Sequence, residues 1–357
     1  MRNLVLASAL ALLASVLGCT PDERPAAPRP TDAQRARRTR RDPPAPPSVS
    51  QVLTRTFTSR ALGVDKTYQV YLPRGYARTS LRYPVITMLH GLGGDETDWA
   101  RHGHLAEAAD ALSLQAIVVM PDGDDSWYVN AVSPDGRYDT CLRETKPWSW
   151  SPPEDRRRFC VRTPRYEDYI ARDLIAHIDA TYRTIPERRA RAIGGLSMGG
   201  FGALDIAIKH KDLFASVSSH SGLDALLYAG PHPYERGRVR LYEDVRRWAR
   251  GEGAPGAALS AGVRAILGPS IERWREHDPS ALAAGLHDGE LAIYLDCGTE
   301  DGLLFDDEAQ YLHEVLEQHG VRHELHLLPG VHDWSFWQAR IDDSLRFHAR
   351  ALVPPRR

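Results

Sequence analysis

One short stretch, Gly195 to Gly200, restricts the fold of this chain more than any other. It reads Gly-Leu-Ser-Met-Gly-Gly, with a strand-like run before it at 191–193 and a helix-like run after it at 201–208. Glycines on both sides of Ser197 permit a sharp turn with a strained serine backbone. The helix behind the turn directs free amide N–H groups toward the serine. The stretch therefore predicts a turn that presents Ser197 at the end of a sheet, with a plain glycine-rich turn as the alternative.

Strand-like and helix-like segments alternate along the rest of the chain. The runs 84–89 and 115–120 are continuously apolar, as in strands buried on both faces. Further strands are expected at 67–72, 192–193, 215–218, 291–295 and 323–328. Apolar residues repeat at helical spacing in 166–182 and 306–319. This alternation predicts an α/β fold with a doubly wound, mostly parallel sheet and a ligand site at the carboxyl ends of its strands.

Two insertions interrupt the alternation. Residues 124–164 are polar and aromatic, and residues 222–289 form a larger segment of helices and loops. Each follows the end of a predicted strand, so both are expected to overhang the ligand site. The folded domain is expected to span residues 51–353, long enough for one α/β domain with a sizeable core.

The N-terminus carries signals for export. Arg2 precedes a short apolar run from Leu4 to Leu17, which suits a signal peptide at 1–18 better than a membrane span. The sequence Val-Leu-Gly-Cys then ends at Cys19 in the order of a lipoprotein cleavage site. We expect a lipidated Cys19 that anchors the chain to a membrane of the cell envelope. Plain secretion after cleavage near Ala14 is the alternative.

Residues 19–50 are expected to be an extended tether. They are rich in Pro, Arg and Ala and almost free of aliphatic side chains, so they cannot bury enough apolar surface to fold. The basic cluster at 35–41 is interpreted as a solvated linker, with attraction to anionic lipid headgroups or envelope polymers as an alternative. An exported tether disfavours a nucleic-acid arm, and the formal net charge of −2 implies no strongly charged partner for the whole chain.

Three cysteines lie within the predicted domain. Cys141 and Cys160 flank a Pro-, Trp- and Arg-rich loop and are expected to form a disulfide in an oxidising compartment, with two free thiols as the alternative. Cys297 ends an apolar strand and is expected to be a small buried side chain. No pair of cysteines has zinc-ligand spacing, and no metal or other cofactor is expected.

A serine hydroxyl is a poor nucleophile until a base removes its proton. His332 follows the last predicted strand, on the loop where such a base would hang over Ser197. The weaker candidates for the base are His90, His220, His323 and His326. We therefore expect His332 to be the general base and, later, the acid that protonates the leaving group.

An acid is expected to hold the imidazole in its productive tautomer and stabilise its cation. Asp301 lies in the loop beyond the strand 291–295, after the serine and before the histidine, which is the order typical of this fold. Glu300 and Asp296 are alternatives, and Asp306 is expected to open the next helix. An ordinary turn carboxylate is the competing interpretation of Asp301.

The tetrahedral oxyanion of an acyl-transfer reaction needs two hydrogen-bond donors. The backbone N–H of Met198, directly after the serine, is expected to be one of them. The glycine-rich loop His-Gly-Leu-Gly-Gly at 90–94 can turn another amide inward, and we assign the second donor to the N–H of Leu92. A simple turn is the alternative for this loop.

Together these stretches resemble the esterase D and S-formylglutathione hydrolase group of α/β-hydrolases, which also includes secreted feruloyl and acetyl-xylan-type esterases and mycolyltransferases. The resemblance covers about 58–347 and rests on four motifs, at 90–94, 195–200, 298–301 and 329–337. It implies an α/β-hydrolase fold. It also implies a nucleophile at Ser197, an acid at Asp301, a base at His332 and oxyanion donors at Leu92 and Met198.

The segment 121–130 looks like the one that walls the substrate pocket in bacterial members of this group. The resemblance therefore implies that Trp127 and Asn130 line the pocket, with a capped loop and a packed tryptophan as the alternative. The segment closed by Cys141 and Cys160 departs from cytoplasmic formylglutathione hydrolases. An exported chain would meet few glutathione thioesters, so the departure favours an ester of the cell envelope.

The sequence thus predicts an exported serine esterase that hydrolyses carboxylic esters through an acyl-serine intermediate. Acyl transfer to a sugar or lipid alcohol uses the same three residues and is the first alternative. A non-catalytic binding protein on a hydrolase scaffold is the second. The expected partners are a small-molecule or envelope ester and, through Cys19, a membrane; nucleic acid is not expected.

Overall fold

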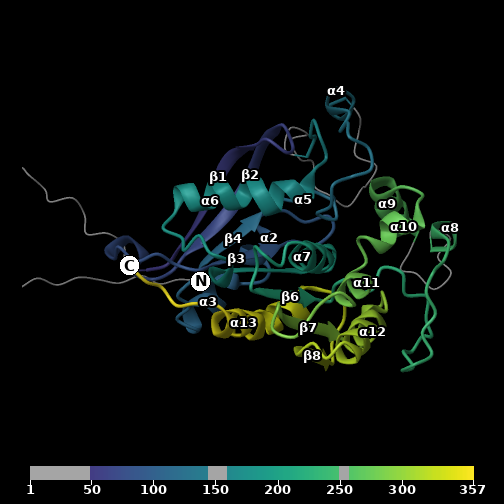
Figure 1. Ribbon diagram of the computed structural model, residues 1–357. Coiled ribbons are helices and arrows are strands. Elements are labelled where there is room, and N and C mark those ends of the chain that lie inside the picture. Colours follow the sequence, from purple (N-terminus) through teal and green to yellow (C-terminus); the bar gives the residue numbers. More distant parts are fainter. Residues whose placement is uncertain (1–48, 144–158, 249–256) are drawn as a thin grey trace, which may run out of the picture. The chain divides into compact units, whose positions relative to one another are not determined.

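A mixed, mostly parallel sheet forms the centre of the fold in the computed structural model, which describes residues 49–143, 159–248 and 257–357 (Figure 1). Within these residues the sheet has eight strands in the order β1-β2-β4-β3-β5-β6-β7-β8. The strands are β1 Gln51–Ser59, β2 Val64–Leu72, β3 Val85–Leu89, β4 Ile117–Pro121, β5 Arg191–Leu196, β6 Ser216–His220, β7 Ala292–Gly298 and β8 His323–Leu328. The first two are antiparallel and the remaining six run parallel to one another. The predicted doubly wound α/β-hydrolase sheet is confirmed.

Helices cover both faces of this sheet because successive side chains of a strand point to opposite sides. Ile86 and Met88 of β3 pack with α3 (Leu105–Ala111) and α13 (Trp334–Ala351). Val85 and Leu89 face the other layer, which contains α6 (Ile175–Thr181), α7 (Met198–Lys209) and α12 (Phe305–Gln318) (Figure 1). The apolar strand runs seen in the sequence are therefore buried on both faces, as predicted.

The shorter helices complete the connections. The helix expected at 166–182 consists of α5 (Tyr166–Asp168), a π-helical stretch (Tyr169–Leu174) and α6. The remaining elements are η1 Tyr76–Arg78, α2 Asp98–Arg101, α4 Tyr138–Cys141, η4 Arg188–Ala190, α8 Val245–Trp248, α9 Ala257–Leu267, α10 Ile271–Arg275 and α11 Pro279–Ala283. Among the described residues, none of the helices has both the length and the apolar character needed to cross a bilayer.

The strand β1 was not expected from the sequence. It pairs with β2 from Gln51↔Leu72 to Ser59↔Val64 and lies at the edge of the sheet, so most of its side chains are at least partly exposed and lack an apolar pattern. Because β2 runs antiparallel to β4, the start of β1 beside Leu72 lies toward the amino end of β4. The described chain therefore begins at the end of the sheet opposite the carboxyl ends of the parallel strands.

The two insertions meet each other in the structure. The N–H of Val132 in the first insertion donates to the carbonyl oxygen of Ile266 in the second, at 2.8 Å. The Arg273 guanidinium donates to the Asn130 carbonyl oxygen. Cys141 and Cys160 form the predicted disulfide, and Cys297 is buried, also as predicted.

Several predictions concern residues outside the described ranges. The signal peptide at 1–18, the lipidation site Cys19 and nearly all of the tether at 19–50 lie there, as does part of the loop between Cys141 and Cys160. The described residues belong to one compact unit. The domain boundaries at 51 and 353 stay predictions.

Candidate active site

Ser197 occupies a tight turn between β5 and α7. Its backbone has φ 51° and ψ −117°, a sparsely populated conformation for a residue with a side chain. The Ser197 N–H donates to the His220 carbonyl oxygen at 2.9 Å, which fixes the turn against β6. A Cβ on Gly199 would lie 2.5 Å from the Leu89 carbonyl oxygen, so only glycine lets the helix start this close to β3. The predicted strand, turn and helix are all present.

The structure brings Ser197, His332 and Asp301 together. Nε2 of His332 lies 3.0 Å from Oγ of Ser197, and Nδ1 of His332 lies 2.7 Å from Oδ2 of Asp301. With Nδ1 donating to the carboxylate, Nε2 is free to accept the serine proton. Ser197 and His332 are partly exposed, whereas the Asp301 side chain is fully buried. This arrangement can activate the hydroxyl toward a bound carbonyl group.

Two aromatic rings and a backbone amide hold the imidazole and the carboxylate in place. The rings of Phe305 and Trp337 meet the His332 ring nearly perpendicularly, with centroids 5.3 and 5.0 Å away. The N–H of Leu303 donates to Oδ1 of Asp301 at 2.8 Å. These contacts could not be predicted from the sequence, although Trp337 follows His332 closely along the chain.

The loop at 90–94 forms a type II turn beside Ser197. The Gly94 N–H donates to the Gly91 carbonyl oxygen at 3.1 Å, and Gly93 has φ 78° at the third position, where this turn requires a glycine-like conformation. Because the Gly91 carbonyl points into the turn, the N–H of Leu92 on the same trans peptide points out of it. A Cβ on Gly91 would lie 3.6 Å from Cβ of Ser197, so this peptide lies against the nucleophile turn.

His90 ties the turn to the loop after β4. Its Nε2 accepts the Gly123 N–H at 2.8 Å, so the proton sits on Nδ1, which donates to the Gly91 carbonyl oxygen at 2.8 Å. Asp125 accepts the Gly93 N–H at 2.7 Å. His90 is fully buried and holds the loop that carries Leu92, rather than acting as a base.

A buried lysine supports the same loop, and the sequence did not reveal it. Nζ of Lys66 lies 2.7 Å from Oδ2 of Asp122 and 2.9 Å from Oδ2 of Asp124, and Tyr166 donates to Asp124. Burial opposes the charge on Asp122, but its neighbours, Lys66 foremost, outweigh burial and hold the pKa of this carboxyl below its ordinary value. A buried cation with two carboxylate partners fixes the segment that follows β4.

The competing candidates for base and acid have other partners. His220 and Asp296 are both fully buried, and Nδ1 of His220 lies 2.8 Å from Oδ2 of Asp296. His323 contacts His313, and His326 contacts Glu324 on the edge strand β8. Glu300 is exposed, and Asp306 lies in the first turn of α12, as expected. Asp301 is thus the alternative among these acids that contacts His332.

Comparison with known proteins identifies the family of this chain. A family model described as "Putative esterase" matches residues 59–348. The chain belongs to this esterase family. Esterase Rv1288 of Mycobacterium tuberculosis is 28% identical over 288 residues, covering 77% of this esterase-family chain and 54% of that relative. The chain therefore spans about half the length of the curated mycobacterial relatives it matches.

Solved structures agree with the fold. An S-formylglutathione hydrolase from Agrobacterium tumefaciens is 20% identical to the esterase-family chain, with a TM-score of 0.62 over 86% of this chain and 97% of that one. A ferulic acid esterase is 24% identical, with a TM-score of 0.57 over 85% of this chain and 98% of that one. At this identity the likeness establishes the α/β-hydrolase fold and not the substrate.

The two residues expected to line the pocket, Trp127 and Asn130, make packing contacts. Trp127 is 2% exposed, meets Phe201 of α7 edge-on with ring centroids 5.6 Å apart, and has no hydrogen-bond partner for Nε1 among the described residues. The Asn130 side chain accepts the Asp168 N–H at 3.3 Å. These are the contacts of a capped loop with a packed tryptophan. That either residue lines the substrate pocket stays a prediction.

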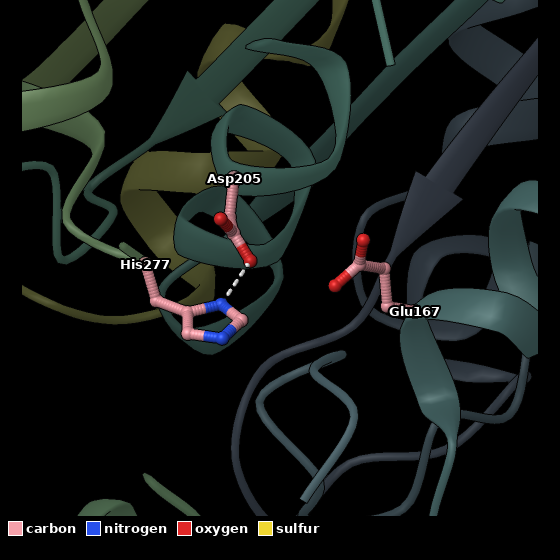
Figure 2. Close-up of side chains that lie close together, drawn as sticks. All are labelled: Glu167, Asp205 and His277. Carbon is pink, nitrogen blue, oxygen red and sulfur yellow. Dashed lines mark hydrogen bonds and ion pairs between the residues drawn. The ribbon is translucent and has the colours of Figure 1, made fainter. Parts of the chain in front are cut away.

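Among the described residues, one buried cluster has residue types that could hold a metal ion. Figure 2 shows the Glu167 carboxylate facing Asp205 and His277, whose Nδ1 lies 2.9 Å from Oδ2 of Asp205. Nζ of Lys209 lies 2.6 Å from Oε2 of Glu167 and 3.7 Å from Oδ2 of Asp205. His210 and Lys209 overcome the effect of burial and lower the pKa of Glu167 to about 2. The Lys209 ammonium group thus supplies positive charge to these carboxylates. The cluster connects α5, α7 and the second insertion.

Proposed function

We propose that this protein is a serine carboxylic ester hydrolase that works through an acyl-serine intermediate. The observation that carries the proposal is the His332 imidazole, which lies within hydrogen-bond distance of Ser197 Oγ on one side and of Asp301 on the other. The esterase family supports the reaction class. The strained turn at Ser197 supports its role as the nucleophile, because such strain is stored at functional sites.

The proposed reaction has two halves. Ser197 Oγ attacks the ester carbonyl carbon while its proton passes to Nε2 of His332. The N–H groups of Leu92 and Met198 donate to the oxyanion, and His332 returns the proton to the departing alcohol. Water then attacks the acyl-serine, with His332 again as base, and releases the acid. Asp301 keeps the imidazole oriented and stabilises its cation without taking a proton.

Turnover of p-nitrophenyl acetate and butyrate, together with labelling by a fluorophosphonate, tests this proposal. The wild-type protein should turn over at least one ester and become labelled, and Ser197→Ala should lose labelling and at least about 10⁴ in kcat. Ser335→Ala is a matched control, because Ser335 is an exposed serine at the start of α13 whose hydroxyl donates to Asp333. Turnover retained in Ser197→Ala, or no turnover and no labelling in the wild type, would overturn the proposal.

The substrate is proposed to be an ester of the cell envelope reached by an exported protein. The support is the signal-like segment at 1–18, the lipidation motif ending at Cys19 and the disulfide, which suits an oxidising compartment. Membrane fractionation of wild type and Cys19→Ala tests the anchor: the wild type should sediment with membranes and the variant should not. Equal partition of both would contradict lipidation. A screen across acyl chain lengths, feruloyl esters and acetyl sugars tests the substrate class.

A further inference from the structure

A chain of buried side chains runs behind Asp301 and returns to His332. The indole Nε1 of Trp337 donates to Oγ of Ser221 at 3.2 Å. The Ser221 hydroxyl is near enough to the Cys297 thiol to act against the rise in its pKa. Sγ of Cys297 lies 3.5 Å from Oδ2 of Asp301, the same oxygen that accepts from His332. The Trp337 ring packs on the His332 ring, which closes the loop of contacts.

The groups at the two ends of this series of side chains, the Trp337 indole and the Asp301 carboxylate, determine which atoms donate and which accept along it. An indole N–H can only donate, and a carboxylate can only accept. Ser221 Oγ therefore accepts from Trp337 and turns its own proton toward the sulfur, and the thiol turns its proton toward Asp301. Burial raises the pKa of the Cys297 thiol well above its ordinary value, and the charge of Asp301 raises it further, so the thiol keeps the proton it donates. Aligned hydrogen bonds of this kind strengthen one another.

The backbone at Ser221 is itself unusual. Ser221 has φ 44°, a left-handed conformation uncommon for a residue with a side chain, and its N–H donates to the Asp296 carbonyl oxygen at 2.7 Å. The residue is 1% exposed and follows β6 directly. This turn brings the hydroxyl between Trp337 and Cys297, which lie on α13 and β7.

From this geometry we infer that Trp337, Ser221 and Cys297 are positioning residues that deliver a third hydrogen-bond donor to Asp301 and thereby set the proton affinity of His332. The inference rests on the proposed function, in which Asp301 and His332 serve Ser197. Without the thiol proton, the imidazole is the one remaining donor to Oδ2 of Asp301 among the described residues. It then attracts the Nδ1 proton more strongly and stabilises the imidazolium, so the pKa of His332 rises.

Other charged groups face this region and stay constant across the test. Asp224, Asp306 and Glu308 interact with Cys297 or Asp301, and Asp333 interacts with His332. Because Cys297→Ala and Cys297→Ser leave all four in place, a difference between these variants reports on the donor at position 297. Ser221→Gly removes the middle link without opposing the local backbone, since glycine favours positive φ.

Titration of His332 by proton NMR, through its low-field Nδ1–H resonance, measures the effect without requiring turnover. Cys297→Ala should raise the pKa of His332 by roughly 0.3–0.7 pH unit, the size expected for one weak hydrogen bond. Ser221→Gly should raise it in the same direction, and Cys297→Ser should lie closer to the wild type than alanine does. The double variant Cys297→Ala, Ser221→Gly should shift no further than the larger single change, because both break one chain.

The acid limb of the pH profile of kcat/KM should move by the same amount. A purely structural role would lower activity at every pH and leave the titration of His332 unmoved. That result, or additive shifts from the two single variants, would overturn the inference. If the wild type turns over no ester but the NMR shifts appear, the proposed function fails and the hydrogen-bond chain stands.

Discussion

His220 and Asp296 form a fully buried histidine–carboxylate pair one strand away from the candidate site. Nδ1 of His220 lies 2.8 Å from Oδ2 of Asp296, and its Nε2 lies 2.9 Å from Oγ of Ser344. The three side chains repeat the Ser-His-Asp contacts seen at Ser197, yet all of them are fully buried. The difference between the two sets is access: only Ser197 and His332 are open to a substrate.

The two histidines should therefore respond in opposite ways to the same substitution. His220→Asn breaks the fully buried hydrogen bonds to Asp296 and Ser344 and should lower the free energy of unfolding by about 3 kcal/mol, while fluorophosphonate labelling of the folded protein persists. His332→Asn should abolish labelling and change stability by less than about 1 kcal/mol. Urea denaturation and labelling of both variants measure this. Loss of labelling in folded His220→Asn would contradict the assignment.

The type II turn at 90–94 offers a way to delete one oxyanion donor and nothing else. Leu92 occupies the second position of the turn, where proline is favoured, so Leu92→Pro removes the N–H without disturbing the backbone. We expect kcat to fall about 10²–10³-fold with the unfolding midpoint preserved. Leu92→Ala, which keeps the N–H, is the matched control and should retain most activity. Equal kinetics for the two variants would exclude this amide as a donor.

Asp224 should make stability depend on pH between about pH 4 and pH 7. Burial and the nearby Asp296 raise its pKa to about 7, although Ser219 donates to Oδ1, and Oδ2 has no partner among the described residues. For an acid with a raised folded-state pKa, the stability present below about pH 4 is lost as the pH rises toward 7. Asp224→Asn removes the carboxyl group and with it the free-energy cost of ionising it in the folded protein.

The free energy of unfolding of Asp224→Asn, relative to that of the wild type, should accordingly increase as the pH rises. We expect it to be more stable than the wild type at pH 8.5 by up to about 4 kcal/mol and near it or below it at pH 4.5. Urea unfolding of both proteins at the two pH values measures the change in their difference. A difference that is the same at both pH values would show that Asp224 is ionised with little cost.

The disulfide closes a loop across a sequence separation of 19 residues. Chain-entropy arguments for a loop of this size give about 3 kcal/mol of stabilisation. The double variant Cys141→Ser, Cys160→Ser should lower the unfolding free energy by up to that amount, and reductant should destabilise the wild type but not the variant. Urea unfolding of the wild type and the double variant, each with and without dithiothreitol, measures these effects. If neither the substitutions nor the reductant changes the unfolding midpoint, the loop unfolds independently of the rest of the domain.

Local patterns explain why the central features could be predicted. The turn at Ser197 is encoded by adjacent glycines, and the buried strands by continuous apolar runs, so both follow from neighbouring residues. The candidate positions of Asp301 and His332 followed from chain order in a sheet whose strand ends share one edge. These signals need no knowledge of packing.

Other features depend on contacts that a sequence does not display. The edge strand β1 is defined by its pairing with β2 and has no apolar pattern of its own. Lys66 reads as an exposed cation until Asp122 and Asp124 are seen around it. The pairing of His220 with Asp296 joins residues 76 positions apart, and it is what separates these two candidates from His332 and Asp301.

The position where β1 begins has a practical consequence. Gln51 pairs with Leu72 at the end of the sheet remote from Ser197. A handle joined ahead of Val49 would therefore meet the described fold on the side away from the nucleophile. Immobilisation of the protein on beads through its N-terminus should leave the entrance to Ser197 facing the bulk solution.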